Sequence, residues 1–276
     1  MSARRPVALT IAGSDSGGGA GVAADLKTFE AHGVWATVAL TAVTAQNTLG
    51  VQAFDAVTPE LVRAQIASVV SDLGVDAAKT GMLASVEVVE AVATTLAEFG
   101  IGPLVVDPVL VSKHGDRLLA ADAVDAIRTL LLPLATVLTP NLPEAEALVG
   151  FPVRTRADME AAARALLELG PEVVLVKGGH LADSGGGSPD CLLAADDTGR
   201  PLAGGPEWLE GVRLPGRHTH GTGCVLSAAI AAELARGMEP ADACVAAKHF
   251  VERAIAAGVA LGSGVGPVDP GWARSH

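Results

Sequence analysis

The chain has 276 residues, of which 50% are apolar and 18% charged, so it can form a core and does not match disordered or fibrous proteins. Its 31 acidic and 19 basic residues give a net charge of −12, and only 3% of the residues are aromatic. This composition disfavours binding to nucleic acid or to an anionic membrane. Because α/β proteins reach about 250 residues as one unit, we expect a single domain over residues 1–276.

The cysteines, Cys191, Cys224 and Cys244, are odd in number and widely spaced. This spacing predicts neither a disulfide framework nor a zinc ribbon, and it favours a reducing compartment. The apolar stretch from Pro6 to Ala12 is too short for a signal peptide, and no apolar run approaches the roughly 20 residues of a membrane span. We therefore expect a cytoplasmic protein.

Short apolar runs alternate with helical patterns along the chain. Strands are predicted at residues 7–11, 34–43, 75–79, 104–106, 136–138 and 173–176, and helices at 22–29, 59–72, 85–99, 121–132, 142–149, 155–169, 223–236 and 240–261. Such alternation predicts an α/β fold with a mostly parallel sheet flanked by helices. Residues 181–215, rich in Gly, Asp, Ser and Pro, predict a hairpin or mobile loop near the sheet edge.

A glycine-rich loop, Gly13 to Gly21, joins the first predicted strand to the first helix, where helix N–H groups commonly bind ligands. Its spacing also matches a dinucleotide fingerprint, Gly19-x-Gly21-x-x-Ala24. The acidic residue that NAD binding needs about 20 residues later is replaced by T-A-Q-N at 44–47, which disfavours NAD. Three successive glycines indicate close approach of the backbone to some other ligand.

A second glycine-rich segment, T-H-G-T-G-C at 219–224, precedes a run of small residues. Its last four residues would form a turn at a helix N-terminus that could bind an anion, although an ordinary loop-to-helix junction explains the pattern equally well. No Walker-type G-x-x-x-x-G-K-S/T occurs, which excludes that class of NTPase. His218 and His220 have no further ligand cluster beside them, so we do not expect a transition-metal site.

Several polar residues lie near the predicted strand ends. Asn141 and Glu144 fit a helix start, and Asp107 is either a functional carboxylate at the sheet edge or a turn residue. Gln46, after the second predicted strand, and Asp25, in the first helix, could bind the edge of a heterocycle.

Together these motifs resemble one family. The segments are AGSDSGGGAGVAADLKTF, TAQNT, KTGML, VDPV, TPNLPEA, VKGGH and THGTGC. The sequence resembles the hydroxymethylpyrimidine/phosphomethylpyrimidine kinases of thiamine biosynthesis, in the ribokinase-like superfamily, from about Val7 to Pro267. The resemblance implies a three-layer α/β/α domain, often a homodimer. With ATP and Mg²⁺ it would phosphorylate 4-amino-5-hydroxymethyl-2-methylpyrimidine (HMP) and then HMP phosphate.

The resemblance also implies roles for individual residues. The pyrimidine pocket would be lined by Gly13, Ala20, Asp25, Gln46, Met82 and Val109, with Gln46 pairing with the aminopyrimidine edge. Mg²⁺ and its waters would be held by the N-x-x-E pair, Asn141 and Glu144. The phosphates would face Asp107, Lys177 and the anion hole formed by Gly221, Thr222, Gly223 and Cys224. Most of the superfamily has an aspartate base at the last of these positions, whereas this family has a cysteine.

Two residues depart from the family pattern beside the phosphate site. His218 stands where Asn often precedes Thr-His, and Val225 where Thr usually follows the cysteine, which affects the expected nucleotide affinity more than the reaction type. From its place at a helix N-terminus, Cys224 is expected to have a lowered pKa.

Two other functions remain open. One is a pyridoxal kinase of the same fold, and the other is a non-catalytic pyrimidine sensor. The sensor is disfavoured because the residues implied for catalysis are all present, namely Asn141, Glu144, Lys177 and Cys224.

Overall fold

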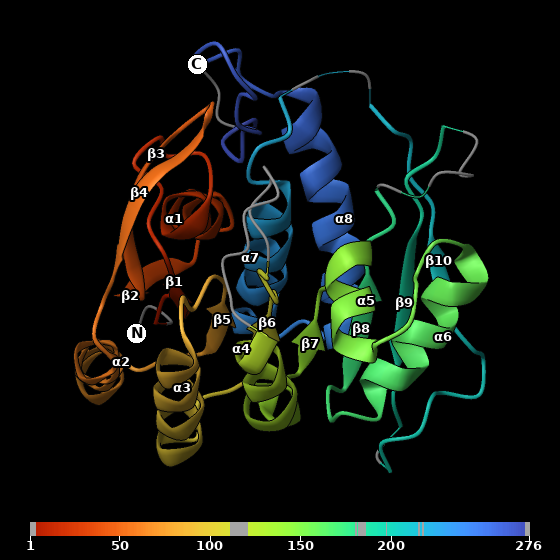
Figure 1. The fold of residues 1–276 in the computed structure, drawn as a ribbon, viewed down its shortest axis with the longest axis horizontal. Coiled ribbons are helices and arrows are strands. Elements are labelled where there is room, and N and C mark those ends of the chain that lie inside the picture. The colour runs from red at the N-terminus through yellow and green to blue at the C-terminus, as the bar shows by residue number, and fades with distance from the viewer. Residues whose placement is uncertain are drawn as a thin grey trace.

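A mostly parallel sheet with helices on both faces forms the centre of the molecule (Figure 1). The computed structural model describes residues 4–110, 121–179, 181, 186–196, 198–214, 216 and 218–273. The strand order is β10-β9-β8-β7-β6-β5-β1-β2. Six strands are parallel, namely β1 (Val7–Ala12), β2 (Trp35–Leu40), β5 (Ala77–Thr80), β6 (Leu104–Val106), β7 (Val137–Leu138) and β8 (Val173–Val176). Antiparallel β9 (Asp190–Ala194) and β10 (Glu207–Leu209) complete one edge.

Two apolar cores cover the two faces of this sheet. One contains residues of α2 (Pro59–Asp72), α3 (Val86–Phe99), α4 (Ala121–Ala126), α5 (Leu142–Val149) and α6 (Arg156–Leu167). The other contains α1 (Gly21–Ala31), α7 (Thr222–Ala235) and α8 (Pro240–Ala256). Both faces of the inner strands are therefore buried, which explains why they read as unbroken apolar runs.

Most predicted elements are confirmed, because capping residues and buried strands mark their bounds in the sequence. Side chains of Thr58, Ser85, Asn141 and Thr155 accept backbone N–H groups at the starts of α2, α3, α5 and α6. The stretch 181–215 supplies the β9–β10 hairpin at the sheet edge, as predicted. The last helix ends at Ala256, earlier than the predicted residue 261.

The prediction of one buried strand at 34–43 is wrong. The chain leaves the main sheet at Thr41, and β3 (Ala42–Asn47) pairs with β4 (Gly50–Ala56) in a separate hairpin. Along β3 buried and exposed side chains alternate, which is typical of a strand with one face in solvent. Gln46 consequently lies within β3 rather than after a strand of the main sheet.

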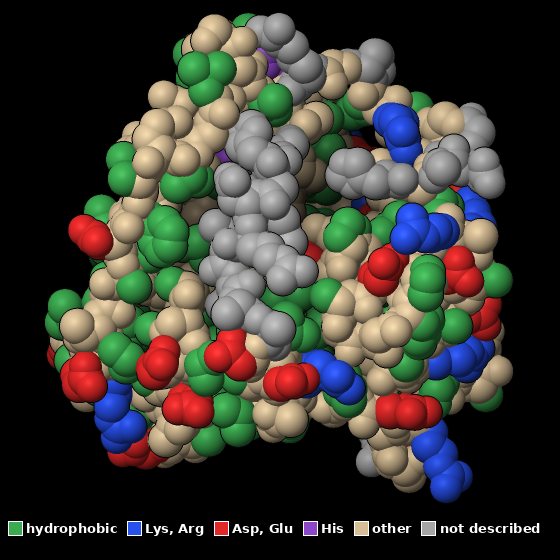
Figure 2. All heavy atoms as spheres, in the orientation of Figure 1, with side chains coloured by type: hydrophobic (Ala, Val, Ile, Leu, Met, Phe, Trp, Pro, Cys, Tyr) green, Lys and Arg blue, Asp and Glu red, His purple; other side chains and the backbone are tan. Residues whose placement is uncertain are grey.

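Acidic side chains are unevenly distributed over the face of the molecule in Figure 2. In Figure 2 acidic side chains lie mostly over the helices in the lower half of the view, with basic side chains among them. Of the helices in the described ranges, none has the length and hydropathy needed to cross a bilayer.

Candidate functional site

Candidate residues from five strands converge on one edge of the main sheet. Gly13, Asp107 and Lys177 directly follow β1, β6 and β8, and Met82 and Asn141 lie two or three residues beyond β5 and β7. Because these strands are parallel neighbours, their carboxyl ends share that edge. Helix α7 packs against β1, β5 and β6, and its first turn lies beside these residues.

The β6–β8 half of this edge holds an ion pair. Lys177 Nζ lies 2.9 Å from Asp107 Oδ1, and their side chains are 15% and 3% exposed. Asp107 also accepts the Thr139 hydroxyl at 3.4 Å and the Ser227 hydroxyl at 3.3 Å. Burial alone would raise the pKa of Asp107, but Lys177 and Lys79 outweigh it and lower it. Asp107 is therefore an ionised member of a charge network and more than a turn residue.

Asn141 and Glu144 form a capping box at the start of α5. The Asn141 side chain accepts the Glu144 N–H at 2.9 Å, and Glu144 Oε2 accepts the Asn141 N–H at 2.8 Å. The same carboxylate oxygen lies 4.0 Å from Lys177 Nζ. Burial, reinforced by Asp107 and opposed by Lys177, raises the pKa of Glu144 to about 7. The helix-start interpretation is thus confirmed, and the position beside Lys177 leaves a second role possible.

The first turn of α7 faces this charge network. A Cβ added at Gly223 would lie 3.4 Å from Lys177 Nζ and 3.7 Å from Asp107 Oδ2. Gly221 has φ +80°, and a Cβ there would lie 1.8 Å from the Gly19 carbonyl oxygen, so the close contact between the two glycine-rich loops requires glycine. Helix N-termini bind anions through free N–H groups.

The expected lowered pKa of Cys224 is wrong. Burial, opposed by Lys79 and the Gly21 N–H and reinforced by the carboxylates of Asp25 and Asp107, raises the pKa of the thiol to about 11. In the sequence, the helix N-terminus is the only feature near Cys224 that affects its pKa. The residues that bury the thiol and the two carboxylates belong to segments far away in the chain. Cys224 in this structure is therefore a neutral thiol at pH 7.

A second lysine–aspartate pair, between Lys79 of β5 and Asp25 of α1, lies at the β1–β5 half of the site. Lys79 Nζ lies 2.9 Å from Asp25 Oδ2, and both side chains are 0% exposed. Thr10 donates its hydroxyl to the same oxygen at 2.6 Å, and Asp25 Oδ1 has no hydrogen-bond partner among the described residues. Burial would lower the pKa of Lys79, but Asp25 outweighs it and keeps the ammonium charged.

Of the remaining residues expected to bind pyrimidine, Gly13, Ala20 and Met82 lie at the same half, whereas Val109 follows β6. A Cβ added at Gly13 would lie 2.5 Å from Met82 Cε, so Gly13 makes room for this side chain. Ala20 donates its N–H to Asp15 at the start of α1, and Val109 lies two residues beyond Asp107. Their binding roles stay predictions.

Sequence reasoning gave no role to Asp15, Lys79 or His220, although the structure places all three at the site. His220 Nε2 lies 3.0 Å from Asp15 Oδ2 and 3.4 Å from Gln46 Nε2. The only sequence signals were their positions inside the G-S-D-S-G, K-T-G-M-L and T-H-G-T-G-C segments. The other histidine of the pair, His218, accepts the Gly266 N–H at 3.2 Å.

The donor chemistry beside Lys177 fits Mg²⁺, which takes one or two carboxylates, substrate phosphates and several waters. Asp107 and Glu144 supply the carboxylates, and the first turn of α7 lies beside Asp107. Among the described residues, no group of three or more His, Cys, Asp or Glu side chains could hold a metal ion by itself. Phosphates and waters would therefore have to complete the coordination of Mg²⁺.

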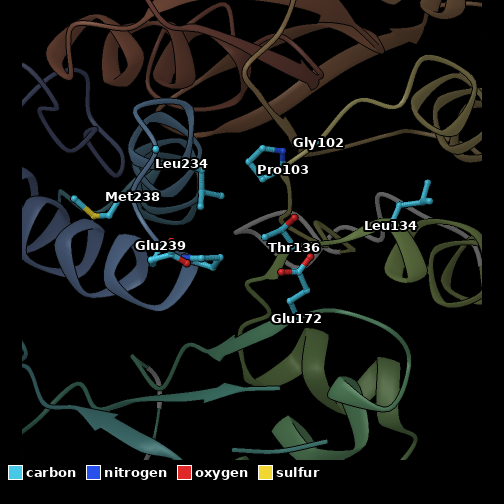
Figure 3. Close-up of a pocket in the computed structure, with 10 residues that line it drawn as sticks. Gly102, Pro103, Leu134, Thr136, Glu172, Leu234, Met238 and Glu239 are labelled. Carbon is cyan, nitrogen blue, oxygen red and sulfur yellow. The ribbon is translucent and has the colours of Figure 1, made fainter. Parts of the chain in front are cut away.

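Two cavities lie outside this charge network. One, of about 520 Å³, lies between the C-terminal part of α8 and the segment after β10, lined by residues including Gly211, Val212 and Glu252. The other, of about 550 Å³, is drawn in Figure 3 and includes Pro103, Thr136 and Glu172. These three residues precede β6, β7 and β8, so the second cavity lies at the opposite edge of the sheet.

The family model described as Phosphomethylpyrimidine kinase matches residues 15–269. The chain belongs to this family. It is 53% identical to a hydroxymethylpyrimidine/phosphomethylpyrimidine kinase of Streptomyces coelicolor, over 97% of this chain and 95% of the relative.

Solved structures of similar proteins share the fold. A Bacillus subtilis pyridoxal kinase solved with ADP is 39% identical, with a TM-score of 0.88 over 97% of this chain and 98% of that one. A phosphomethylpyrimidine kinase of Clostridium difficile is 37% identical, with a TM-score of 0.78 over 91% of this chain and 100% of that one. The fold of this family member is therefore ribokinase-like, as the sequence motifs predicted.

Proposed function

We propose that this protein is an ATP- and Mg²⁺-dependent kinase that phosphorylates HMP to HMP phosphate and then HMP phosphate to HMP diphosphate in thiamine biosynthesis. The observation that carries this proposal is the family match over residues 15–269. The charge network at the carboxyl edge of the sheet supports it, since phosphoryl transfer depends mainly on positioning and charge stabilisation.

Each half of the site has its own task in this proposal. Lys177 and the N–H groups of Gly221, Thr222, Gly223 and Cys224 bind the transferred phosphoryl group. Asp107, Asn141 and Glu144 would hold Mg²⁺ and its waters, and the bound metal would neutralise charge on the phosphates. The cavity beside α8 has a volume in the range of small-ligand pockets and accommodates the nucleoside of ATP.

Pyrimidine binding belongs to the β1–β5 half, with Gly13, Ala20, Asp25, Gln46, Met82 and Val109 around the ring. Cys224 lies between the halves, next to the hydroxymethyl group. Because its thiol is neutral at pH 7, it can accept the proton of HMP only after losing its own. HMP phosphate is already largely ionised at pH 7 and needs no base. The cytoplasmic location, the single domain and the homodimer stay predictions.

The second candidate is a pyridoxal kinase, favoured by the similarity to the Bacillus subtilis enzyme. ADP release measured separately with HMP, HMP phosphate and pyridoxal distinguishes the candidates. We expect turnover with both pyrimidines to exceed turnover with pyridoxal. Preference for pyridoxal would favour the second candidate, and binding of HMP without ADP release would indicate the non-catalytic sensor.

A further inference from the structure

Asp15, His220 and Gln46 meet between the two glycine-rich loops, and the proposed function uses only Gln46. The His220 ring nitrogen Nε2 faces Asp15 Oδ2 at 3.0 Å and the Gln46 amide at 3.4 Å. The Asp15 and His220 side chains are 2% and 14% exposed, so neither is a freely moving surface group. Their arrangement calls for an explanation beyond loop packing.

Asp15 is held in one place and accepts every hydrogen bond it makes. Its carboxylate accepts N–H groups of Gly17, Gly19 and Ala20 at 2.8, 3.0 and 2.8 Å. Burial would raise its pKa, but the hydrogen bonds from His220 and the backbone outweigh burial and lower it. An ionised carboxylate has no proton to give, so His220 Nε2 carries the proton between them.

The imidazole is fixed in position as well as in tautomer. A Cβ added at Gly19 would lie 2.7 Å from His220 Cδ2, so the ring packs directly on that glycine. The backbone on both sides of the ring is tied down, because the His220 N–H donates to Gly266 at 3.0 Å and its carbonyl accepts the Val268 N–H at 3.1 Å. His220 therefore presents one N–H at one place.

Gln46 reaches this N–H from a fixed backbone. Its N–H donates to the Ser16 hydroxyl, which donates to the Gln46 carbonyl, both at 2.7 Å. The β3–β4 register shifts between Ala45 and Gln46, and such irregularities re-aim side chains. The His220 N–H donates mainly to Asp15 at 3.0 Å and can share its proton with Gln46 only as a weaker, three-centre hydrogen bond. Two N–H groups cannot hydrogen-bond to each other, so this arrangement requires Oε1 of the amide, not its NH₂ group, to face His220.

We propose that His220, held by Asp15, is a positioning residue that sets the orientation of the Gln46 amide and so selects the heterocycle edge that the site accepts. The identity of the ligand rests on the proposed function. With Oε1 turned to His220, the NH₂ group donates to a ring nitrogen, and the second lone pair of Oε1 accepts an exocyclic amino group. Without His220 the amide can rotate and lose this pattern.

Kinetics of His220→Leu, His220→Gln, Gln46→Leu and the His220→Leu/Gln46→Leu double variant test the proposal. An unpaired buried polar group corresponds to a change of about 5- to 100-fold, so we expect His220→Leu to raise KM for HMP by that factor with little change in kcat. Glutamine keeps an N–H at a similar reach, so His220→Gln should restore KM to within about threefold. The double variant should be no worse than Gln46→Leu.

Multiplicative losses in the double variant, or a fall in kcat at unchanged KM, would overturn the proposal, because His220 would then act independently of Gln46. A readout in the empty protein separates this result from failure of the proposed function. The Gln46 side-chain NH₂ signals in an ¹⁵N–¹H NMR spectrum, identified by their loss in Gln46→Leu, should move to solvent-like values in His220→Leu and stay near wild-type values in His220→Gln. Unchanged signals in His220→Leu would reject the inference even if HMP is not the substrate.

Discussion

Two lysine–aspartate pairs with the same separation occupy the two halves of the site. The Lys79–Asp25 and Lys177–Asp107 contacts are both 2.9 Å long. The first pair is 0% exposed at both side chains, whereas the Lys177 side chain is 15% exposed and faces the α7 N-terminus and Glu144. The same residue types at the same distance therefore have different surroundings.

This difference in surroundings separates structural from functional charge. The fully enclosed pair joins α1 to β5, and its two charges neutralise each other. Removing one partner leaves the other charge buried and unpaired, which strongly lowers the stability of the folded protein. An ion pair that opens onto a helix N-terminus can exchange partners with an arriving anion. We therefore expect loss of the closed pair to act mainly on stability and loss of the open pair mainly on turnover. Asp25 keeps its proposed place beside the pyrimidine through Oδ1, which has no partner among the described residues.

The largest expected effect is on the closed pair. Lys79→Met leaves the Asp25 carboxylate buried without a cation, which should lower the free energy of unfolding by about 3–5 kcal/mol. Urea unfolding measures this loss. Replacing both partners, in Lys79→Met/Asp25→Leu, should recover much of it, because no unpaired charge remains. A loss below about 1 kcal/mol in the single variant would contradict the assignment.

Cys224 lies between the two pairs, and its pKa is affected by both aspartates. Cys224→Ala should reduce HMP phosphorylation by about 10²- to 10⁴-fold, the usual contribution of a positioned base, and should reduce HMP phosphate phosphorylation much less. Since the pKa of the thiol is about 11, the thiolate fraction rises with pH. Wild-type turnover of HMP should therefore increase by up to about tenfold per pH unit from pH 7 to 9.

Equal losses in the two half-reactions would instead assign Cys224 to the anion hole. Cys224→Ser is the matched control, because it keeps the size and the backbone N–H but replaces the thiol with a far weaker acid. It should resemble Cys224→Ala in the first half-reaction and lack the rise with pH.

The sequence predicted the elements whose signals are local. Buried strands such as β6 and β8 and the capped helix α5 have their predicted bounds, because apolar runs and capping residues are readable within a few positions. The β3–β4 hairpin was missed because the half-exposed β3 follows the apolar β2 with one intervening residue, so that the two strands form one run.

Asp107 was predictable because it directly follows a strand, whereas Lys177, which also directly follows a strand, was implied only by the resemblance. Pairings across the chain were not predictable. Asp15 and His220 are separated by 205 positions, and Asp25 and Lys79 by 54, so nothing local indicates that they meet. The pKa of Cys224 was predicted wrongly for the same reason, since the groups that set it come from several segments.

A smaller effect is expected when the open pair is broken. Lys177→Met should reduce turnover by about 10²- to 10³-fold, comparable with loss of one transition-state donor. Its effect on unfolding should be well below that of Lys79→Met, because Asp107 keeps the Thr139 and Ser227 hydroxyls. Steady-state kinetics and urea unfolding of both variants test the contrast. Equal destabilisation by the two substitutions would break the comparison.

The smallest expected effect concerns Glu144, the second carboxylate beside Lys177. Its pKa is about 7 in the folded protein and 4.5 as the ordinary value, so between these pH values the folded state keeps a proton that the unfolded state releases. Stability from this group is therefore complete below pH 4.5 and is lost as pH rises towards 7, by at most about 3 kcal/mol. The glutamine side chain of Glu144→Gln does not titrate. Subtracting the unfolding free energy of this variant from that of the wild type therefore removes the pH dependence due to all other groups.

Urea unfolding of both proteins from pH 4.5 to 8 measures this difference. The free energy of unfolding of the wild type relative to Glu144→Gln should fall as pH rises. A difference that rises with pH would contradict this expectation, because it would show that Lys177 outweighs burial and brings the pKa of Glu144 below its ordinary value. The expected fall would show that burial and Asp107 outweigh Lys177, so that Glu144 is about half protonated near pH 7 and able to release its proton when a cation binds.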